Sequence, residues 1–337
     1  MSPPPDGFMA PSKVAVVHSE VKREYFPTVA QYLTEKDSEK EALAVAGYLK
    51  KLGIGFKLMA ADENIFASLK KYRPEIILNM TGSVAGKEYL ATLVPAAAEV
   101  LGIPCTGSSF QDETLAYNKS YIKKMMSEAG IPVPKAHLIT VNSQQFPQDL
   151  SYPSIVKLNS IHGSVEINKE AVCNTAEQVK KRIRYLQIKY HDAVLVEEFI
   201  EGEEFSVICF DRPGLEVYAA KNIFGSDNNP RSFASFEYQW DEQEIGFQKY
   251  HDPILSDLAV KGYHACGMRD YGKFDVRQNR EGTYYFIDGN TNPAFGPKES
   301  DCALGTVMDL YGFSFEKVLI MLFTNVNQRL SPASRKE

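Results

Sequence analysis

The chain has 337 residues, 44% hydrophobic and 24% charged, with a formal net charge of −6 at pH 7. This composition is that of a soluble globular protein too long for a single core, so we expect two or three domains. The acidic balance without a basic block argues against nucleic acid or an anionic membrane as partner, and no apolar run approaches the roughly 18 residues that span a bilayer.

The start of the chain and its cysteines favour a cytoplasmic protein. Residues 1–11 are proline-rich and lack the basic and apolar regions of a signal peptide, so we expect a disordered lead-in. The five cysteines are widely spaced and form no C-x-x-C pair. Reduced thiols are therefore expected rather than disulfides or a zinc site.

The first third of the chain alternates strands with helices. Runs of β-branched and apolar residues predict the strands, and amphipathic segments that end near glycine predict helices. Such alternation is typical of a parallel α/β sheet. The predicted strands are residues 13–18, 55–60 and 75–79, and the predicted helices are residues 37–53, 63–72 and 88–102.

Beyond residue 119 strands follow one another in runs, with helices set to one side, which indicates α+β domains. We expect an N-terminal domain at 12–118, a central domain at 119–198 and a C-terminal domain at 199–325. The predicted strands are 136–140, 154–158, 193–200, 203–210, 216–220, 272–278 and 283–288, the helices are 174–190, 253–267 and 313–324, and residues 222–252 are predicted to be irregular.

Several common motifs are absent. The segment "GSVAGKE" (82–88) resembles a Walker A loop, but it has only three residues between its glycines, and Glu88 stands where Ser or Thr is needed. No G-x-G-x-x-G follows the first strand, the six histidines show no H-E-x-x-H spacing, and no G-x-S-x-G elbow occurs.

Charged residues in apolar strands are more informative. Lys119 opens a helix, and Lys157 lies in the strand "SIVKL", where it needs an anionic partner or access to solvent. Each lysine alone would pass for a surface residue. Glu197 and Glu198 end the strand "VLVEE", and Glu204 follows shortly after. Acidic residues in such strands need donors, which an adenine amino group or ribose hydroxyls can supply.

Carboxylates gather again near the end of the sequence, in "YYFIDGNTNPAF" (284–295). Asp288 and Asn290 are two residues apart, so they share one face of a strand, and Asp275 lies on the preceding strand. Asp and Asn are also good turn residues, and for this stretch alone that simpler interpretation is favoured. If the strands form a hairpin, however, the three side chains meet and suit Mg²⁺.

The order of these features resembles the ATP-grasp superfamily, and among its members the D-alanine–D-alanine ligase-like group. The resemblance covers roughly residues 75 to 325. Its segments appear in register as "GIPCTGSS", "NKSYIKKMMSEAGIPVPKA", "PSIVKLNSIHGSV", "VLVEEFIEGEEFSV" and "FDVRQNREGTYYFIDGNTNPAFGP". It implies an N-terminal parallel α/β domain, a central lid domain and a C-terminal domain for ATP and metal.

The resemblance also implies roles for single residues. Lys119 and Lys157 would contact the phosphates of ATP, and Glu197 and Glu198 would flank the adenine. Glu204 would take the ribose. The loop at 160–166 would close over the triphosphate, with Gly163 and Ser164 donating to it. One or two Mg²⁺ ions, with Mn²⁺ as an alternative, would be bound by Asp275, Asp288 and Asn290.

The sequence departs from the family on the ATP side in three ways. The usual Glu-x-Asn metal pair is Asp288-Gly289-Asn290, and the Gly-Ser-Ser lid core reads His162-Gly163-Ser164. Gln239 replaces a lysine that contacts the γ-phosphate, a loss for which Lys221 or Arg231 would have to compensate.

The acceptor side departs further. Lys273 stands where the family uses an arginine fork for the acceptor carboxylate, and a lysine offers only a point charge. Glu299 and Ser300 replace a Ser-Leu pair that grips the same carboxylate. Of the acidic N-terminal loop, only Glu24 remains as an anchor for the substrate amine. We therefore group Lys273, Ser164 and Glu24 as candidate catalytic residues.

The sequence thus predicts an ATP- and Mg²⁺-dependent ligase that joins small-molecule carboxylate and amine substrates through an acyl phosphate. The family also implies a homodimer. The first alternative is a D-alanine–D-alanine ligase of cell-wall synthesis. The second is a degenerate ATP-grasp module that binds nucleotide without turnover, which Gln239 and the altered lid favour.

Overall fold

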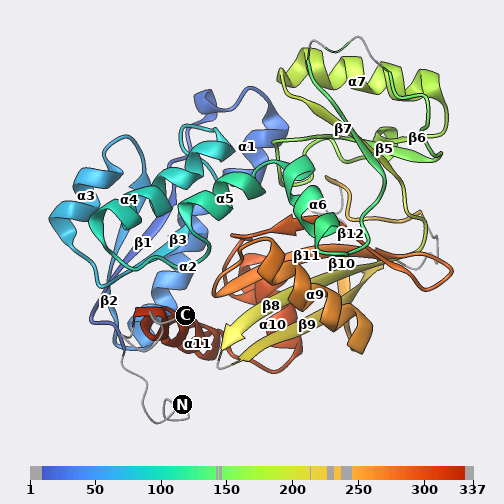
Figure 1. Cartoon of the computed structure of the whole chain (residues 1–337). Helices are drawn as coiled ribbons and strands as arrows, with labels where there is room; N and C mark the ends of the chain where they lie inside the picture. Colours follow the sequence, from blue (N-terminus) through green and yellow to red (C-terminus); the bar gives the residue numbers. More distant parts are fainter. Residues whose placement is uncertain are drawn as a thin grey trace.

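Three sheets form the framework of the protein (Figure 1). The computed structural model describes residues 10–141, 143, 146–212, 214–225, 231–236 and 245–330. Most of the predicted lead-in and Gln239 therefore lie outside the described residues. In Figure 1 the N-terminal sheet is blue to cyan, the central sheet green, and the C-terminal sheet yellow to orange.

The N-terminal sheet is parallel, with strand order β2-β1-β3. Its central strand alternates between two cores, because Val14 and Val16 pack on one face while Ala15 and Val17 pack on the other. Both faces are covered by helices, which is why these strands read as continuous apolar runs. The elements are β1 (Lys13–Ser19), α2 (Ser38–Lys51), β2 (Gly55–Ala61), α3 (Ile65–Tyr72), β3 (Ile76–Met80) and α4 (Leu93–Leu101).

The central sheet is antiparallel, with order β4-β7-β5-β6, and helix α7 (Ala176–Tyr190) packs on it. Val179, Ile183 and Leu186 form the buried stripe of α7, at the i, i+4, i+7 spacing of an amphipathic helix. The strands are β4 (Ala136–Ile139), β5 (Ser154–Leu158), β6 (Val172–Cys173) and β7 (Val194–Glu198).

The C-terminal sheet is also antiparallel, in the order β10-β9-β8-β11-β12. Helices α6 (Lys119–Glu128) and α9 (Pro253–Ala265) pack on one face, and α10 (Ala303–Leu310) and α11 (Phe315–Leu330) on the other. The core under α11 is continuous with the core under α2, which joins the N- and C-terminal sheets. The strands are β8 (Glu203–Arg212), β9 (Gly214–Phe224), β10 (Ile245–Tyr250), β11 (Tyr271–Gln278) and β12 (Tyr284–Asn290).

Several short elements differ from expectation. Strand β10 lies within the stretch predicted to be irregular. It has no clear apolar pattern and forms a strand through its pairing with β9. Helix α1 (Val29–Glu35) has no fully buried residue and gives no periodic signal. The remaining unpredicted elements are α5 (Phe110–Ala116), β6, α10 and the 3-10 turns η1 (Arg23–Tyr25), η3 (Lys169–Ala171) and η4 (Lys298–Ser300). The helix predicted at 88–102 begins as the 3-10 turn η2 (Glu88–Thr92) and continues as α4.

Among the described residues, none of the helices has the length and hydropathy needed to cross a membrane.

Candidate active site

A cavity of about 110 Å³ lies between the central sheet and the β11–β12 hairpin. Charged side chains share its walls with apolar ones, including Ile155, Ile167 and Phe233. Such a mixture suits a ligand with a flat apolar part and a charged part. The predicted site residues that line it are Lys119, Lys157, Gly163, Ser164, Glu197, Glu198, Glu204, Asp275 and Asp288.

Two buried lysines share one carboxylate at this cavity. Lys157 Nζ lies 3.0 Å from Glu197 Oε2, and Lys123 Nζ lies 3.2 Å from Glu197 Oε1. Both ammonium groups also donate to the carbonyl of Ile287, at 2.8 Å from Lys123 and 3.1 Å from Lys157. Glu197, predicted to flank the adenine, therefore has its side chain committed to these two cations.

A β-bulge explains why the carbonyl of Ile287 is available. The β11–β12 register passes from Asp275 opposite Asp288 to Val276 opposite Phe286, which leaves Ile287 as the extra residue. A bulged residue is unpaired in the ladder, so its carbonyl can accept from side chains. The sequence reasoning missed Lys123, although it lies four residues after Lys119 and therefore on the same helix face.

The environment of Asp288 is strongly cationic. Burial alone would raise the pKa of Asp288, but Lys119 and Lys157 together hold it well below its usual range. Lys119 Nζ also donates to the carbonyl of Ile161 at 2.8 Å, at the start of the lid loop. Burial, followed by repulsion from Lys119, lowers the pKa of His162 to about 4, so its imidazole is neutral at pH 7. Asp288 is thus ionised and able to bind a cation.

The β11–β12 hairpin brings the predicted metal ligands together. Asp275 lies opposite Asp288, and Asn290 lies opposite Lys273. Two carboxylates and an amide oxygen at one strand end form a donor set that fits Mg²⁺. Lys273 Nζ donates to both carboxylate oxygens of Asp275, at 2.6 and 2.8 Å. The residue predicted to bind the acceptor therefore also neutralises one of the predicted metal ligands.

Glu204 and Arg277 form a second buried charged group. Glu204 Oε2 accepts from Arg277 Nη1 at 2.7 Å, and Glu204 Oε1 accepts from the backbone of Ala234 at 3.2 Å. Burial raises the pKa of Glu204, and Arg277 opposes this rise. Arg277 also donates to the carbonyls of Ile200 and Gly202, which fixes the turn before β8.

Other predicted residues lie elsewhere. Lys221 pairs with Glu203, and Arg231 pairs with Glu201, so neither ammonium nor guanidinium is among the groups on the cavity wall. Glu24 is exposed on η1. In η4, Glu299 is exposed and Ser300 is partly buried.

Two other carboxylates near the lid were given no functional role by the sequence analysis. Burial raises the pKa of Glu35 to about 7, against the effect of the Ser19 and Ser83 hydroxyls. Burial also raises the pKa of Glu88 to about 8, and Lys119 acts in the opposite direction. Nothing in the sequence pattern distinguishes these two from the many surface acids around them.

The lid loop (160–166) and Ile167 directly after it contact three other segments. The backbone of His162 donates to Glu88 Oε2 at 2.8 Å, and Ile167 accepts from the backbone of Phe236 at 2.7 Å. Gly163 has φ +65° and lies so close to α1 that a Cβ there would be 2.8 Å from Thr34 Cγ2. Only glycine satisfies both requirements.

Together, a parallel N-terminal sheet, an antiparallel central sheet and a hairpin that carries the predicted metal ligands beside a lysine-lined cavity define the ATP-grasp ligase class. The chain belongs to the D-ala D-ala ligase C-terminus family, whose model matches residues 125–324. Membership confirms the ATP-grasp fold, an ADP-forming ligase of carbon–nitrogen bonds, and ATP with Mg²⁺ as cofactors.

Individual proteins agree with this assignment. The chain is 27% identical to the D-alanine–D-alanine ligase B of Pseudomonas putida over 82% of this chain and 87% of the relative. The fold is similar to that of a D-alanine–D-alanine ligase from Bacillus anthracis solved with ATP, at 18% identity, with TM-score 0.72 over 94% and 98% of the two chains. It is also similar to the VanG D-Ala:D-Ser ligase of Enterococcus faecalis, at 18% identity and TM-score 0.66 over 94% and 99%.

Proposed function

We propose that this protein joins two amino acids, or an amino acid and a similar metabolite, and that D-alanine is not its preferred acceptor. The proposal is supported by one contrast. The cavity keeps the lysines and the β11–β12 hairpin that the family uses for ATP and Mg²⁺, whereas the residues expected to bind the acceptor differ from those of the family. Bound ATP would transfer its γ-phosphoryl group to the carboxylate with release of ADP, Mg²⁺ would neutralise the phosphate charge, and the amine would then displace phosphate from the acyl phosphate.

The residues of the cavity act by position and charge. Lys119 and Lys157 neutralise phosphate oxygens, and Gly163 and Ser164 donate to them from the lid. Asp275, Asp288 and Asn290 would hold Mg²⁺, with Asp288 ionised under the influence of its lysine neighbours.

On the nucleoside side, Glu204 accepts from a ribose hydroxyl at Oε2, beside its bond from Arg277, because Oε1 already accepts from Asn222 and Ala234. Glu198 faces the adenine. Glu197 acts indirectly here, by holding Lys157 in place.

Two carboxylates are better placed than Glu24 to bind the substrate amine. Glu35 and Glu88 are partly buried beside the lid, whereas Glu24 is exposed. A buried carboxylate with a raised pKa gains from a cationic partner, which removes the cost of its own ionisation. We therefore assign amine binding to Glu35, supported by Glu88.

Acceptor choice follows from Lys273. Its ammonium is engaged by Asp275, so one adaptable contact replaces the two parallel bonds of an arginine fork. Glu299, exposed on η4, adds negative charge near Tyr48 and Lys298. These features disfavour a simple acceptor carboxylate and favour an acceptor with a hydroxyl or a positive group.

The second candidate function is D-alanine–D-alanine ligation, which the activity named for the Pseudomonas putida relative favours. The homodimer and the cytoplasmic location, both expected from the sequence, are part of the proposal.

A release assay for ADP distinguishes these functions. The protein is incubated with ATP, Mg²⁺ and pairs of D- and L-amino acids, with Asp288→Asn as the matched inactive control. We expect a pair other than D-alanine with D-alanine to give the highest kcat/KM. D-alanine as the best pair would establish the second function. No ADP with any pair, despite nucleotide binding, would favour the degenerate module.

A further inference from the structure

The lid loop ends at a residue with an unfavourable backbone. Glu166 has φ +64°, in the left-handed region where a side chain crowds the backbone. Residues held in this region persist only where their surroundings impose the conformation. Glycine would adopt it without strain, so the glutamate side chain must have another reason to be there.

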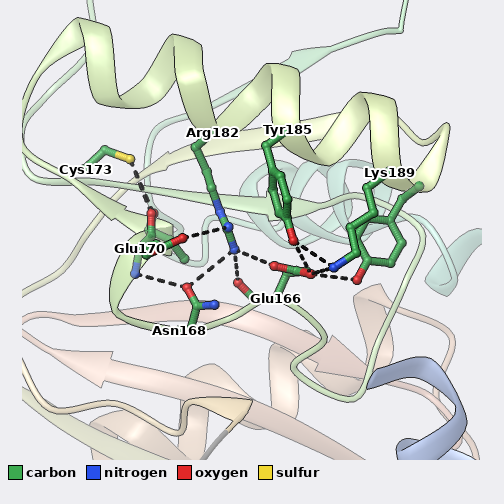
Figure 2. A network of polar contacts seen from close by, with 9 residues as sticks. Glu166, Asn168, Glu170, Cys173, Arg182, Tyr185 and Lys189 are labelled. Carbon is green, nitrogen blue, oxygen red and sulfur yellow. Dashed lines mark hydrogen bonds and ion pairs between the residues drawn. The ribbon is translucent and has the colours of Figure 1, made fainter. Parts of the chain in front are cut away.

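The side chain of Glu166 joins the loop to helix α7 (Figure 2). Lys189 Nζ donates to its Oε1 at 2.7 Å, and Tyr190 donates to the same atom at 2.8 Å. Arg182 Nη2 donates to the Glu166 carbonyl at 2.6 Å and to Oε2 at 3.0 Å, and the Tyr185 hydroxyl adds a contact at 3.1 Å. In Figure 2 the side chains of Arg182, Tyr185 and Lys189 extend from α7 toward the loop.

The carboxylate of Glu166 is ionised within this network. Burial acts to raise its pKa, but the hydrogen bonds from Lys189 and Tyr190 prevail and lower it. Its side chain is only 9% exposed, and that of Arg182 only 5%. Partly buried charge-assisted bonds of this kind are stronger and more directional than exposed ones.

The other side of the same loop faces the cavity. Gly163, Ser164 and Val165 line it, directly before Glu166. We propose that Glu166 is a positioning residue for nucleotide binding, which fixes the lid loop to α7 so that Gly163 and Ser164 are presented to the phosphates as one rigid unit. This inference rests on the proposed function, because it takes ATP as the ligand of the cavity.

Two variants separate the side chain from the backbone. Glu166→Gln removes the charge and keeps the strain, whereas Glu166→Gly relieves the strain and removes every side-chain contact. The control is Glu170→Gln, because Glu170 also lies near Arg182, at 3.7 Å, but is 84% exposed. If the competent loop is populated in one molecule in ten, the apparent Kd for ATP rises about tenfold.

We measure ATP binding by calorimetry and hydrogen exchange of residues 160–168 without nucleotide. Both Glu166 variants should weaken ATP binding by about tenfold or more and speed exchange in the loop. Their KM for the amine substrate should stay unchanged, and Glu170→Gln should behave as the wild type.

Variants with lower thermal stability but unchanged ATP affinity and loop exchange would assign Glu166 a structural role only and overturn the proposal. Recovery of wild-type affinity in Glu166→Gly would overturn it too, because backbone conformation alone would then suffice. Failure of the wild-type protein to bind ATP would instead refute the proposed function. Equal ATP binding by the wild type and both Glu166 variants would refute only the role of Glu166.

Discussion

Lys123 and Lys157 offer a matched pair for testing the nucleotide site. Both bind the Glu197 carboxylate and the Ile287 carbonyl, and both are buried. Of these two lysines, only Lys157 lines the cavity. Changing either lysine to methionine leaves Glu197 with the other as its partner, so the cost to folding should be similar in Lys123→Met and Lys157→Met.

The effects on ATP should differ. A charge-assisted hydrogen bond contributes about 1.5–3 kcal/mol, which corresponds to a rise in Kd of about 10- to 150-fold. We expect this loss for Lys157→Met, which removes a donor to phosphate. Lys123→Met removes a positive charge that lies behind the cavity wall rather than on it. The Kd of this variant for ATP should rise by no more than about fivefold, or 1 kcal/mol.

Calorimetric titration with ATP and Mg²⁺ measures both constants, and thermal denaturation without nucleotide checks that the two variants are equally folded. The reasoning would be refuted by an unchanged Kd in Lys157→Met, which would make Lys157 a structural lysine. It would equally be refuted by a larger loss in Lys123→Met, which would mean that phosphate binds on the other side of Glu197.

Two further predictions concern the charges beside the metal hairpin. Lys273→Arg should restore a bidentate group and raise kcat/KM for D-alanine as acceptor by about tenfold, the effect of one extra charge-assisted hydrogen bond. No gain in the ADP-release assay would show that Lys273 does not bind the acceptor. Arg277→Met should destabilise the protein by about 3–5 kcal/mol, because it leaves Glu204 buried and unpaired. Thermal denaturation measures this loss, and adding Glu204→Met should recover much of it; a double variant as unstable as the single one would contradict the argument.

The sequence predicted the parts of the site that follow local rules. The alternation in "TYYFID" defined a strand, and its proximity to "GKFDVRQ" predicted the hairpin that places Asp275 opposite Asp288. Lys157 stood out because a lysine in an apolar strand requires a partner, and Glu197 is that partner. In each case a buried charge had to be compensated within a recognisable strand.

The remaining parts depend on packing between distant segments. Lys123 is an ordinary lysine of an amphipathic helix until α6 packs on β12, where the bulge at Ile287 exposes a carbonyl to it. Glu35 is one of many acids around α1 and α2, and its carboxylate becomes distinctive only where it lies against the loop before η2 and near Ser19. Its proximity to Gly82 explains that glycine, since a Cβ there would lie 2.4 Å from Glu35 Oε1.

The raised pKa of Glu35 has a consequence for pH dependence. Its value of about 7 in the folded protein lies above the ordinary 4.5, chiefly because of burial. The folded state therefore binds a proton that the unfolded chain has lost, and the free protein loses stability as pH rises from about 4.5 to 7. A bound ammonium reverses this preference, because it stabilises the ionised carboxylate.

We therefore expect the KM for the amine substrate to rise by about tenfold for each pH unit below 7, while Glu35 is protonated. Steady-state kinetics from pH 5.5 to 8, on the best substrate pair from the ADP-release screen, measures the slope. Glu35→Gln should flatten the profile and raise KM throughout, whereas Glu24→Gln, on the exposed turn, should leave it unchanged. A wild-type KM that is flat across this window would remove both Glu35 and Glu88 from the amine site, because Glu88, with its pKa of about 8, would also produce a slope there. A slope that survives in Glu35→Gln would instead remove Glu35 and leave Glu88 as the group that titrates.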